Sequence, residues 1–192
     1  GSRTAKGQAV INLIEIDQGE KVTSVLTLGK DEKVKHLFMA TTQGTVKKTE
    51  LADFENIRKT GIIAIKLDEG DELDWVKPTS GENDIILISQ KGMSIRFKES
   101  GVRSTGRATM GVRGIKLDKS DRIVGMGIVD NPDNYLLTIT QNGYGKKTLL
   151  AKHRIQNRGG VGIRALGVNN KTGKIVQSRV VSPEIEDLLV TS

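Results

Sequence analysis

Apolar and polar positions in this chain follow a pattern that returns about every 50 residues. In each copy, branched apolar residues occupy three aligned columns, and a short turn rich in Asp, Asn, Gly or Ser follows them. The copies are INLIEIDQGEKV at Ile11–Val22, IIAIKLDEGDEL at Ile62–Leu73, VRGIKLDKSDRI at Val112–Ile123 and IRALGVNNKTGKI at Ile163–Ile175. A period of this length is typical of propeller blades and predicts an array of one structural unit.

Each unit is expected to contribute four strands. The aligned segment is the first, and the second begins after the turn, at Val22, Leu73, Ile123 and Ile175. The third strand is nearly continuous in apolar residues, which indicates burial on both faces, and it reads HLFMATT, DIILISQ, YLLTIT and DLLVTS. A tight turn at Gly44, Gly92 or Gly143 then leads into a fourth strand, TVKKTEL, MSIRFKES or YGKKTLL. Helix is expected only in short pieces, near Leu51–Ile57 and Leu149–His153.

The pattern therefore predicts an all-β fold, a propeller-like disc of four-stranded antiparallel blades. We expect a single repeat domain over residues 1–192, with approximate units 1–51, 52–102, 103–152 and 153–192. The fourth unit stops within its third strand, so we expect a fragment of about four blades. Repetition of this kind favours a contact surface along successive units over a single catalytic pocket.

Charge points to an anionic partner. The 30 Lys and Arg residues outnumber the 23 Asp and Glu residues, which gives a net charge of +7 and favours nucleic acid. Cysteine is absent, which fits a reducing compartment. No apolar run approaches the length of a membrane span, so we expect no membrane association.

Cations recur at one place in the fourth strand. The third and fourth residues after the turn glycine are Lys47 and Lys48, Ile95 and Arg96, and Lys146 and Lys147, and Lys98 lies further along the second of these strands. We expect these cations to be exposed and to contact DNA phosphates. The alternative is that they protect the edge of a sheet against aggregation.

A second group of cations precedes each copy of the repeat. The segments SRTAKG, NIRKTG, TGRATMG and QNRGGVG all end in Gly and supply Lys6, Arg58 and Lys59, Arg107, and Arg158. Arg has a planar fork of donors suited to phosphate oxygens, and Gly permits a tight backbone path. The alternative is a structural loop with solvated cations. If Gly160 holds a backbone conformation closed to branched residues, Gly160→Val should strain the crossing between the third and fourth units and lower stability.

These segments resemble a known family. QNRGGVG is similar to the glycine-rich box of the DNA gyrase A subunit, Q-R/K-R-G-G-R/K-G, and TQNGYGKKT, VKKTELADF, IRFKES and TGVRGIKL look like repeats of that subunit's C-terminal domain. The resemblance covers essentially the whole chain. Gln156, Arg158, Gly159, Gly160 and Gly162 match the box. Asn157 and Val161 stand where the family usually has cations, so the box is degenerate, and the functionally decisive box is expected upstream of Gly1.

The resemblance implies a β-pinwheel with strands exchanged between neighbouring blades, around whose basic rim duplex DNA wraps. It implies a non-catalytic part of an ATP-hydrolysing type IIA topoisomerase that introduces negative supercoils. The partners would be DNA, the gyrase A cleavage core and the gyrase B subunit in an A2B2 enzyme. ATP and magnesium would bind elsewhere in that enzyme, with no cofactor or metal on this chain. The location would be the bacterial cytoplasm, in association with the nucleoid.

Other functions stay open at this point. One is the C-terminal domain of topoisomerase IV, a close relative that selects DNA segments, and another is a propeller-like scaffold for protein partners. An enzyme with a site in a central channel is disfavoured, because His36 and His153 are isolated and belong to different units. GVGIRA and GVNNKTGK only partly match nucleotide-binding motifs and lie within the repeat.

Overall fold

The computed structural model describes residues 33–54 and 63–184, which form eleven strands and three short 3-10 helices. The strands are β1 (His36–Thr41), β2 (Thr45–Glu50), β3 (Leu73–Thr79), β4 (Asp84–Ser89), β5 (Met93–Lys98), β6 (Val112–Arg113), β7 (Ile123–Val129), β8 (Tyr135–Thr140), β9 (Gly145–Leu149), β10 (Ile163–Arg164) and β11 (Ile175–Val181). The 3-10 helices are η2 (Leu51–Phe54), η3 (Glu99–Gly101) and η4 (Leu150–Lys152). The expected all-β fold is confirmed.

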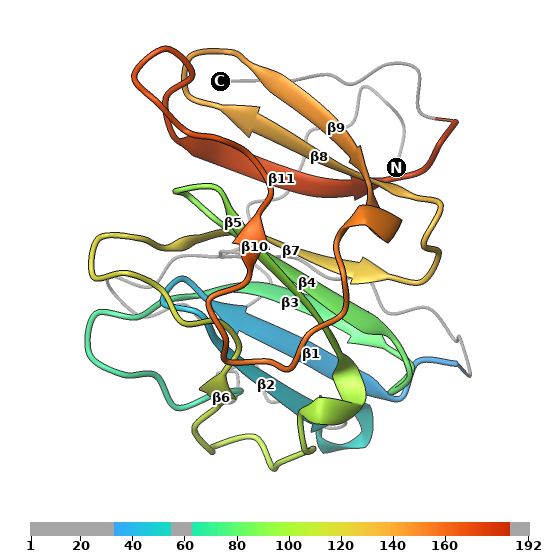
Figure 1. Ribbon diagram of the computed structural model, residues 1–192. Coiled ribbons are helices and arrows are strands. Elements are labelled where there is room, and N and C mark those ends of the chain that lie inside the picture. Colours follow the sequence, from blue (N-terminus) through green and yellow to red (C-terminus); the bar gives the residue numbers. More distant parts are fainter. Residues whose placement is uncertain (1–32, 55–62, 185–192) are drawn as a thin grey trace, which may run out of the picture.

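The strands form three antiparallel sheets, which succeed one another from bottom to top in Figure 1. The first sheet has the order β3-β1-β2-β6, the second β10-β5-β4-β7 and the third β11-β8-β9. Each sheet combines the third and fourth strands of one unit with the second strand of the next unit. In the first two sheets, a short strand from the unit after that completes the set. The expected exchange of strands between neighbours is therefore present.

Local sequence explains the hairpins at the centre of each sheet. Gly44, Gly92 and Gly143 have φ angles of 87°, 91° and 79°, which are easily accessible only to glycine. They connect β1 to β2, β4 to β5 and β8 to β9, as the turn pattern predicts. The second strands β3, β7 and β11 begin at the predicted residues. The first segments differ from expectation, because only two residues of β6 and of β10 pair as strand.

Strand β4 joins the two main parts of the core. All six of its residues are buried, as predicted for a third strand. Ile85 and Leu87 pack in a cluster that includes Phe38 and Phe97. Ile86 and Ile88 point to the other face of the sheet and pack in a second cluster. The core is therefore continuous from the first sheet to the third.

Candidate nucleic-acid interface

Lys47 and Lys48 lie inside the molecule. Their residues are 1% and 7% exposed, because β2 is an internal strand between β1 and β6. The Lys47 ammonium donates to Thr49 Oγ1, to the Ala64 carbonyl and to the Arg107 carbonyl, each at 2.8 Å. Burial lowers the pKa of Lys47, although the carboxylate of Asp53 opposes this shift. Lys47 therefore holds two crossing segments together.

Arg96 is also internal, at 9% exposed, on strand β5. Its Nε and Nη2 atoms donate to Asp84 Oδ2 at 3.0 and 2.7 Å, and Nη1 donates to the Leu150 carbonyl at 3.1 Å. Asp84 is nearly buried as well, so the pair neutralises two charges inside the second sheet. Lys98 lies 3.7 Å from Asp84 Oδ1, but its side chain is 65% exposed.

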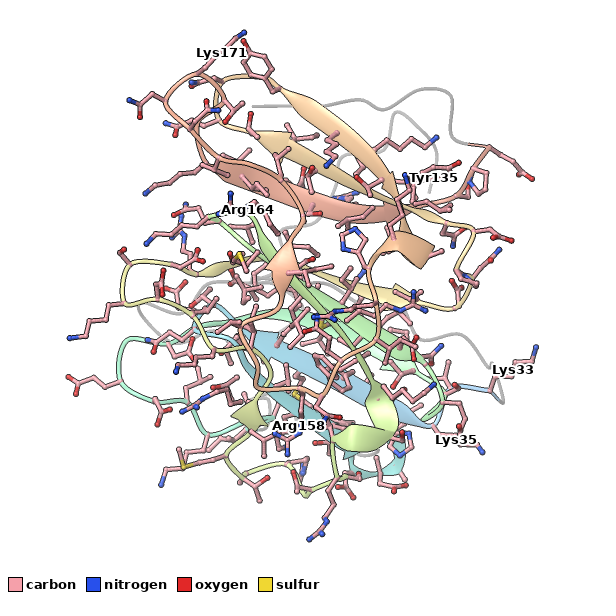
Figure 2. The ribbon with its side chains drawn as sticks, in the orientation of Figure 1. Lys33, Lys35, Tyr135, Arg158, Arg164 and Lys171 are labelled. Carbon is pink, nitrogen blue, oxygen red and sulfur yellow. The ribbon has the colours of Figure 1, made fainter. Side chains whose placement is uncertain are left out.

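Lys146 and Lys147 occupy the same places on β9 and are both exposed. The Lys146 ammonium donates to the Ala165 carbonyl at 3.1 Å, a contact equivalent to that between Lys47 and Ala64. The Lys147 ammonium lies 4.5 Å from the centre of the Tyr135 ring. Tyr135 is labelled in Figure 2 beside the third sheet.

The expectation that this cation column is exposed is therefore wrong for Lys47, Lys48 and Arg96. The alternative of edge protection also fails for these three, because β2 and β5 are internal strands. The physical reason is that segments of later units lie along these strands. β6 and β10 pair with the residues just before the cations, and Ser104 and Ile155 form bridges with Lys48 and Arg96. Lys98, Lys146 and Lys147 remain exposed.

The segment between η4 and β10 carries the glycine-rich box and runs from the third sheet across the second toward β6 (Figure 1). Gln156 N donates to the Arg96 carbonyl, and Gly159 N donates to the Gly114 carbonyl at 2.7 Å. The Arg158 guanidinium donates to the carbonyls of Gly101 at 2.9 Å and Arg113 at 3.2 Å. Arg158 is exposed, yet its side chain also fixes this segment to neighbouring units (Figure 2).

The glycines of the box differ in their constraints. Gly159 and Gly162 have φ angles of 81° and 77°, and a Cβ on Gly162 would lie 2.2 Å from the Ser94 carbonyl oxygen. Gly160 has no positive φ, and the nearest atom to its Cβ would be 3.8 Å away. The condition for strain at Gly160 is therefore not met, because the close backbone approach occurs at Gly162 instead.

Of the remaining predicted cations, Arg107 lies in the loop before β6. Arg107 is half-buried, and its carbonyl accepts a hydrogen bond from Lys47. Lys6, Arg58 and Lys59 lie outside the described residues.

Sequence reasoning missed two further pairs of arginines. Arg103 and Arg154 are exposed at equivalent positions in VRSTGRATMG and HRIQNRGGVG. Arg113 and Arg164 are exposed at equivalent positions of β6 and β10. Extending the alignment of the two loops by a few residues in each direction would have found all four. The exposed arginines therefore recur between the third and fourth units.

His153, the C-cap residue of η4, is buried, with 3% of its surface exposed. Its Nδ1 lies 3.0 Å from Ser94 Oγ. Burial lowers the pKa of His153, and the positive charges of Lys146 and Arg96 lower it further. Among residues 33–54 and 63–184, no three His, Asp or Glu side chains are grouped to hold a metal ion. In the same ranges, no helix has the length and apolar character to cross a membrane.

Sheets that share strands between successive units define a propeller-like repeat protein of the β-pinwheel class. The chain belongs to the family described as DNA gyrase C-terminal domain, beta-propeller, whose model matches residues 1–28, 35–80, 83–130 and 134–182. The resemblance stated from the sequence is therefore confirmed.

Relatives agree with this assignment. The chain is 41% identical over 190 residues to the DNA gyrase A subunit of Escherichia coli, covering 99% of this chain and 22% of the relative. It is 42% identical over 185 residues to the DNA gyrase A subunit of Haloquadratum walsbyi, covering 94% of this chain and 22% of the relative. The chain thus spans about a fifth of the length of the relatives that it matches.

Solved structures show the same fold. The C-terminal domain of DNA topoisomerase IV matches with a TM-score of 0.84 and 28% identity, over 92% of this chain and 55% of that one. The DNA gyrase A C-terminal domain matches with a TM-score of 0.78 and 31% identity, over 93% of this chain and 59% of that one.

Proposed function

We propose that this chain binds duplex DNA without sequence preference and bends it around its surface. The observation that carries the proposal is the recurrence of exposed arginines at equivalent positions of successive units, in a family of gyrase C-terminal domains. Arg103 and Arg154 are the primary candidates, with Arg107, Arg113, Arg158 and Arg164 in the same segments. Lys98, Lys146 and Lys147 add exposed positive charge, whereas Lys47, Lys48 and Arg96 hold the units together.

Repeated cations suit a bent duplex. Bending a 20–30 base-pair site smoothly costs on the order of 1–6 kcal/mol, so several phosphate contacts at regular intervals are needed to offset it. An arginine can donate two hydrogen bonds to one phosphate and keep its charge at any physiological pH. Phosphate contacts carry no base information, so binding should be independent of sequence.

In the intact protein, we propose that this domain presents DNA to a gyrase A cleavage core that acts with gyrase B in an A2B2 enzyme. Strand cleavage, ATP and magnesium belong to those other parts, and wrapping supports negative supercoiling in the bacterial cytoplasm, at the nucleoid. The second candidate is a topoisomerase IV C-terminal domain that selects DNA segments, which the TM-score of 0.84 favours. A supercoiling assay with the intact enzyme distinguishes them, since only the first predicts a net gain of negative supercoils.

A salt titration of DNA binding tests the proposal. Affinity of the chain for a random-sequence duplex should fall linearly with salt on a log-log plot, because bound phosphates release counterions. Replacing Arg103 and Arg154 with Ala should weaken binding and reduce the slope by about two, roughly one for each phosphate that the variant no longer neutralises. The control replaces Lys119 and Lys171, two exposed cations in hairpin turns, and removes the same charge.

The control should reduce the slope much less than the arginine variant. Equal effects would show that overall charge attracts DNA and that the arginines form no interface. An absence of salt-dependent binding would leave the protein scaffold as the better description.

A further inference from the structure

Two exposed apolar side chains lie in the same loops as the arginines. Met110 is 51% exposed and Val161 is 58% exposed. They occupy equivalent positions in the repeat, because Met110 directly precedes Gly111 and Val161 directly precedes Gly162. A single exposed apolar residue is common on protein surfaces and needs no explanation. Recurrence at one position of successive units indicates instead that both side chains meet the same kind of partner.

Arginines flank both of these apolar side chains. Arg107 and Arg113 lie three residues before and three residues after the methionine. Arg158 and Arg164, which are labelled in Figure 2, lie at the same two distances from the valine. Three of these arginines are exposed, and Arg107 is half-buried. Each loop therefore presents one apolar side chain between two cations.

The backbone before each apolar side chain is fixed. The Thr109 carbonyl accepts from Lys66 N at 3.0 Å, and the Gly160 carbonyl accepts from Lys116 N at 2.8 Å. Lys66 and Lys116 are equivalent in the repeat, as are Thr109 and Gly160. The two loops are therefore held by the same hydrogen bond, one residue before the apolar position.

The glycine after each apolar side chain lies close against a neighbouring strand. A Cβ on Gly111 would lie 2.5 Å from the Val46 carbonyl oxygen, and one on Gly162 would lie 2.2 Å from that of Ser94. The backbone is thus held on both sides of the apolar residue. Because the loop is already ordered, it has little backbone freedom to lose when a partner binds the exposed side chain.

The flanking charges and the apolar centre of each loop match the minor groove of duplex DNA. This groove is about 6 Å wide and is bordered by two phosphate strands, and a narrow minor groove attracts arginine. Six residues span at most about 20 Å when extended, which is enough for the two arginines of one loop to reach phosphates on both sides. Between the phosphates, the walls of the groove are formed by deoxyribose, the least polar part of the DNA backbone.

We propose that Met110 and Val161 pack against deoxyribose rings of bound duplex DNA, where the minor groove faces the protein. The inference rests on the proposed function and adds to it a contact that does not depend on charge. Packing against the sugars removes apolar area from water. The contact carries no base information, because every nucleotide of the duplex has the same sugar. Each loop thus holds the duplex through two cations and one apolar side chain.

A salt titration of the full chain separates the apolar contact from the phosphate contacts. The double variant Met110→Ala and Val161→Ala should bind the random-sequence duplex about fivefold more weakly at every salt concentration, because apolar area is lost and no cation is removed. Its log-log line should therefore run parallel to that of the wild type, whereas replacing Arg103 and Arg154 changes the slope. Val176→Ala is the matched control. Val176 is 51% exposed on β11, outside the arginine loops, and its replacement should leave DNA affinity unchanged.

Methyl NMR with labelled methionine detects the contact directly. The chain has four methionines, and Met39 and Met126 serve as internal references because they are 0% and 3% exposed. When the duplex is added, the Met110 methyl signal should shift and should show nuclear Overhauser effects to deoxyribose protons. The signals of Met39 and Met126 should stay in place.

Three outcomes would overturn the inference and leave DNA binding intact. They are equal affinities of the double variant and the wild type, a loss of affinity with Val176→Ala as large as that of the double variant, and a Met110 methyl signal that does not respond to the duplex. A shallower salt slope in the double variant would also count against it, since the change would then act through the cations. A wild type without salt-dependent DNA binding would instead contradict the proposed function, and the inference would fall with it.

Discussion

The tripeptide Lys-Lys-Thr occurs in both β2 and β9, and the two copies lie in opposite environments. In β2, Lys47 and Lys48 are 1% and 7% exposed. In β9, Lys146 and Lys147 are both exposed. Both copies follow a turn glycine and both pair with an apolar third strand. The difference lies in β6 and the loop before it, which belong to a later unit and lie along β2, where Ser104 forms a bridge with Lys48 and the Arg107 carbonyl accepts from Lys47. Burial of a cation in this fold is therefore decided by a remote unit and not by its own strand.

The largest effect should come from breaking the covered ion pair of the second sheet. Arg96→Leu leaves the buried Asp84 carboxylate with only the exposed Lys98 nearby, which should cost roughly 3–5 kcal/mol of unfolding free energy. Lys98→Leu is the matched control, because Lys98 also lies near Asp84 but is exposed, and it should cost no more than about 1 kcal/mol. Urea denaturation measures both. Similar losses would mean that the burial of Arg96 adds nothing to its interaction with Asp84.

The next effect tests the close approach of the glycine-rich box to the backbone of β5. Gly162→Ala places a methyl group against the Ser94 carbonyl at a positive φ, and should lower the unfolding free energy by about 3 kcal/mol, the upper end of backbone strain. Gly160→Ala is the control and should change it by less than about 1 kcal/mol, since the site is open. Thermal melting compares the two. A larger loss at Gly160 would show that the box segment packs differently.

The two lysine copies can be compared directly. Lys47→Met leaves two backbone carbonyls and the Thr49 hydroxyl in the first sheet without their hydrogen-bond donor. We therefore expect the unfolding free energy to fall by roughly 1–3 kcal/mol. Lys146→Met at the exposed copy should cost less than about 0.5 kcal/mol. Chemical denaturation of both variants gives the difference. Equal losses of unfolding free energy would show that the buried lysine of β2 stabilises the fold no more than the exposed lysine of β9.

The smallest effect concerns pH at the boundary between the second and third sheets. Because the pKa of His153 is lowered in the folded state, unfolding binds protons in the window from the folded value up to about 6.5. The stability contributed by neutral His153 is therefore complete above about pH 6.5 and declines as pH falls through that window. Denaturation curves at pH 5, 6 and 7.5 should show this decline.

His153→Val is the comparison for the pH series, since Val102 occupies the equivalent position of the preceding unit and is buried. The variant will differ in absolute stability, so only the pH dependence is compared. It should be weaker in the variant than in the wild type. An identical slope would assign the acid sensitivity to other groups.

The sequence predicted what neighbouring residues determine. Strands β3, β7 and β11 begin at the predicted Leu73, Ile123 and Ile175. A polar turn followed by branched apolar residues favours a strand that starts directly after the turn. The burial of β4 on both faces followed equally from its unbroken run of apolar residues.

What the sequence could not show depends on long-range pairing. The recurrence of Lys48, Arg96 and Lys147 was visible, but coverage by the segments that end in β6 and β10 was not, since two-residue strands have no periodicity of their own. For the same reason the exposed arginines Arg103 and Arg154 were overlooked in favour of buried cations. The hydrogen bonds of Arg158 to two backbone carbonyls likewise depend on a fold that brings distant loops together.

The sharing of strands among three consecutive units has a consequence for synthesis on the ribosome. Val46 can pair with β6 only after Val112 has emerged, and Ser94 can pair with β10 only after Ile163 has emerged. Each sheet is thus finished long after its own hairpin has been translated, and during that delay Lys47 and Arg96 stay in water. A nascent chain would always present one incomplete sheet at its growing end, with charged side chains at the site that the next segment will cover. Those temporarily hydrated cations would discourage premature pairing between neighbouring nascent chains.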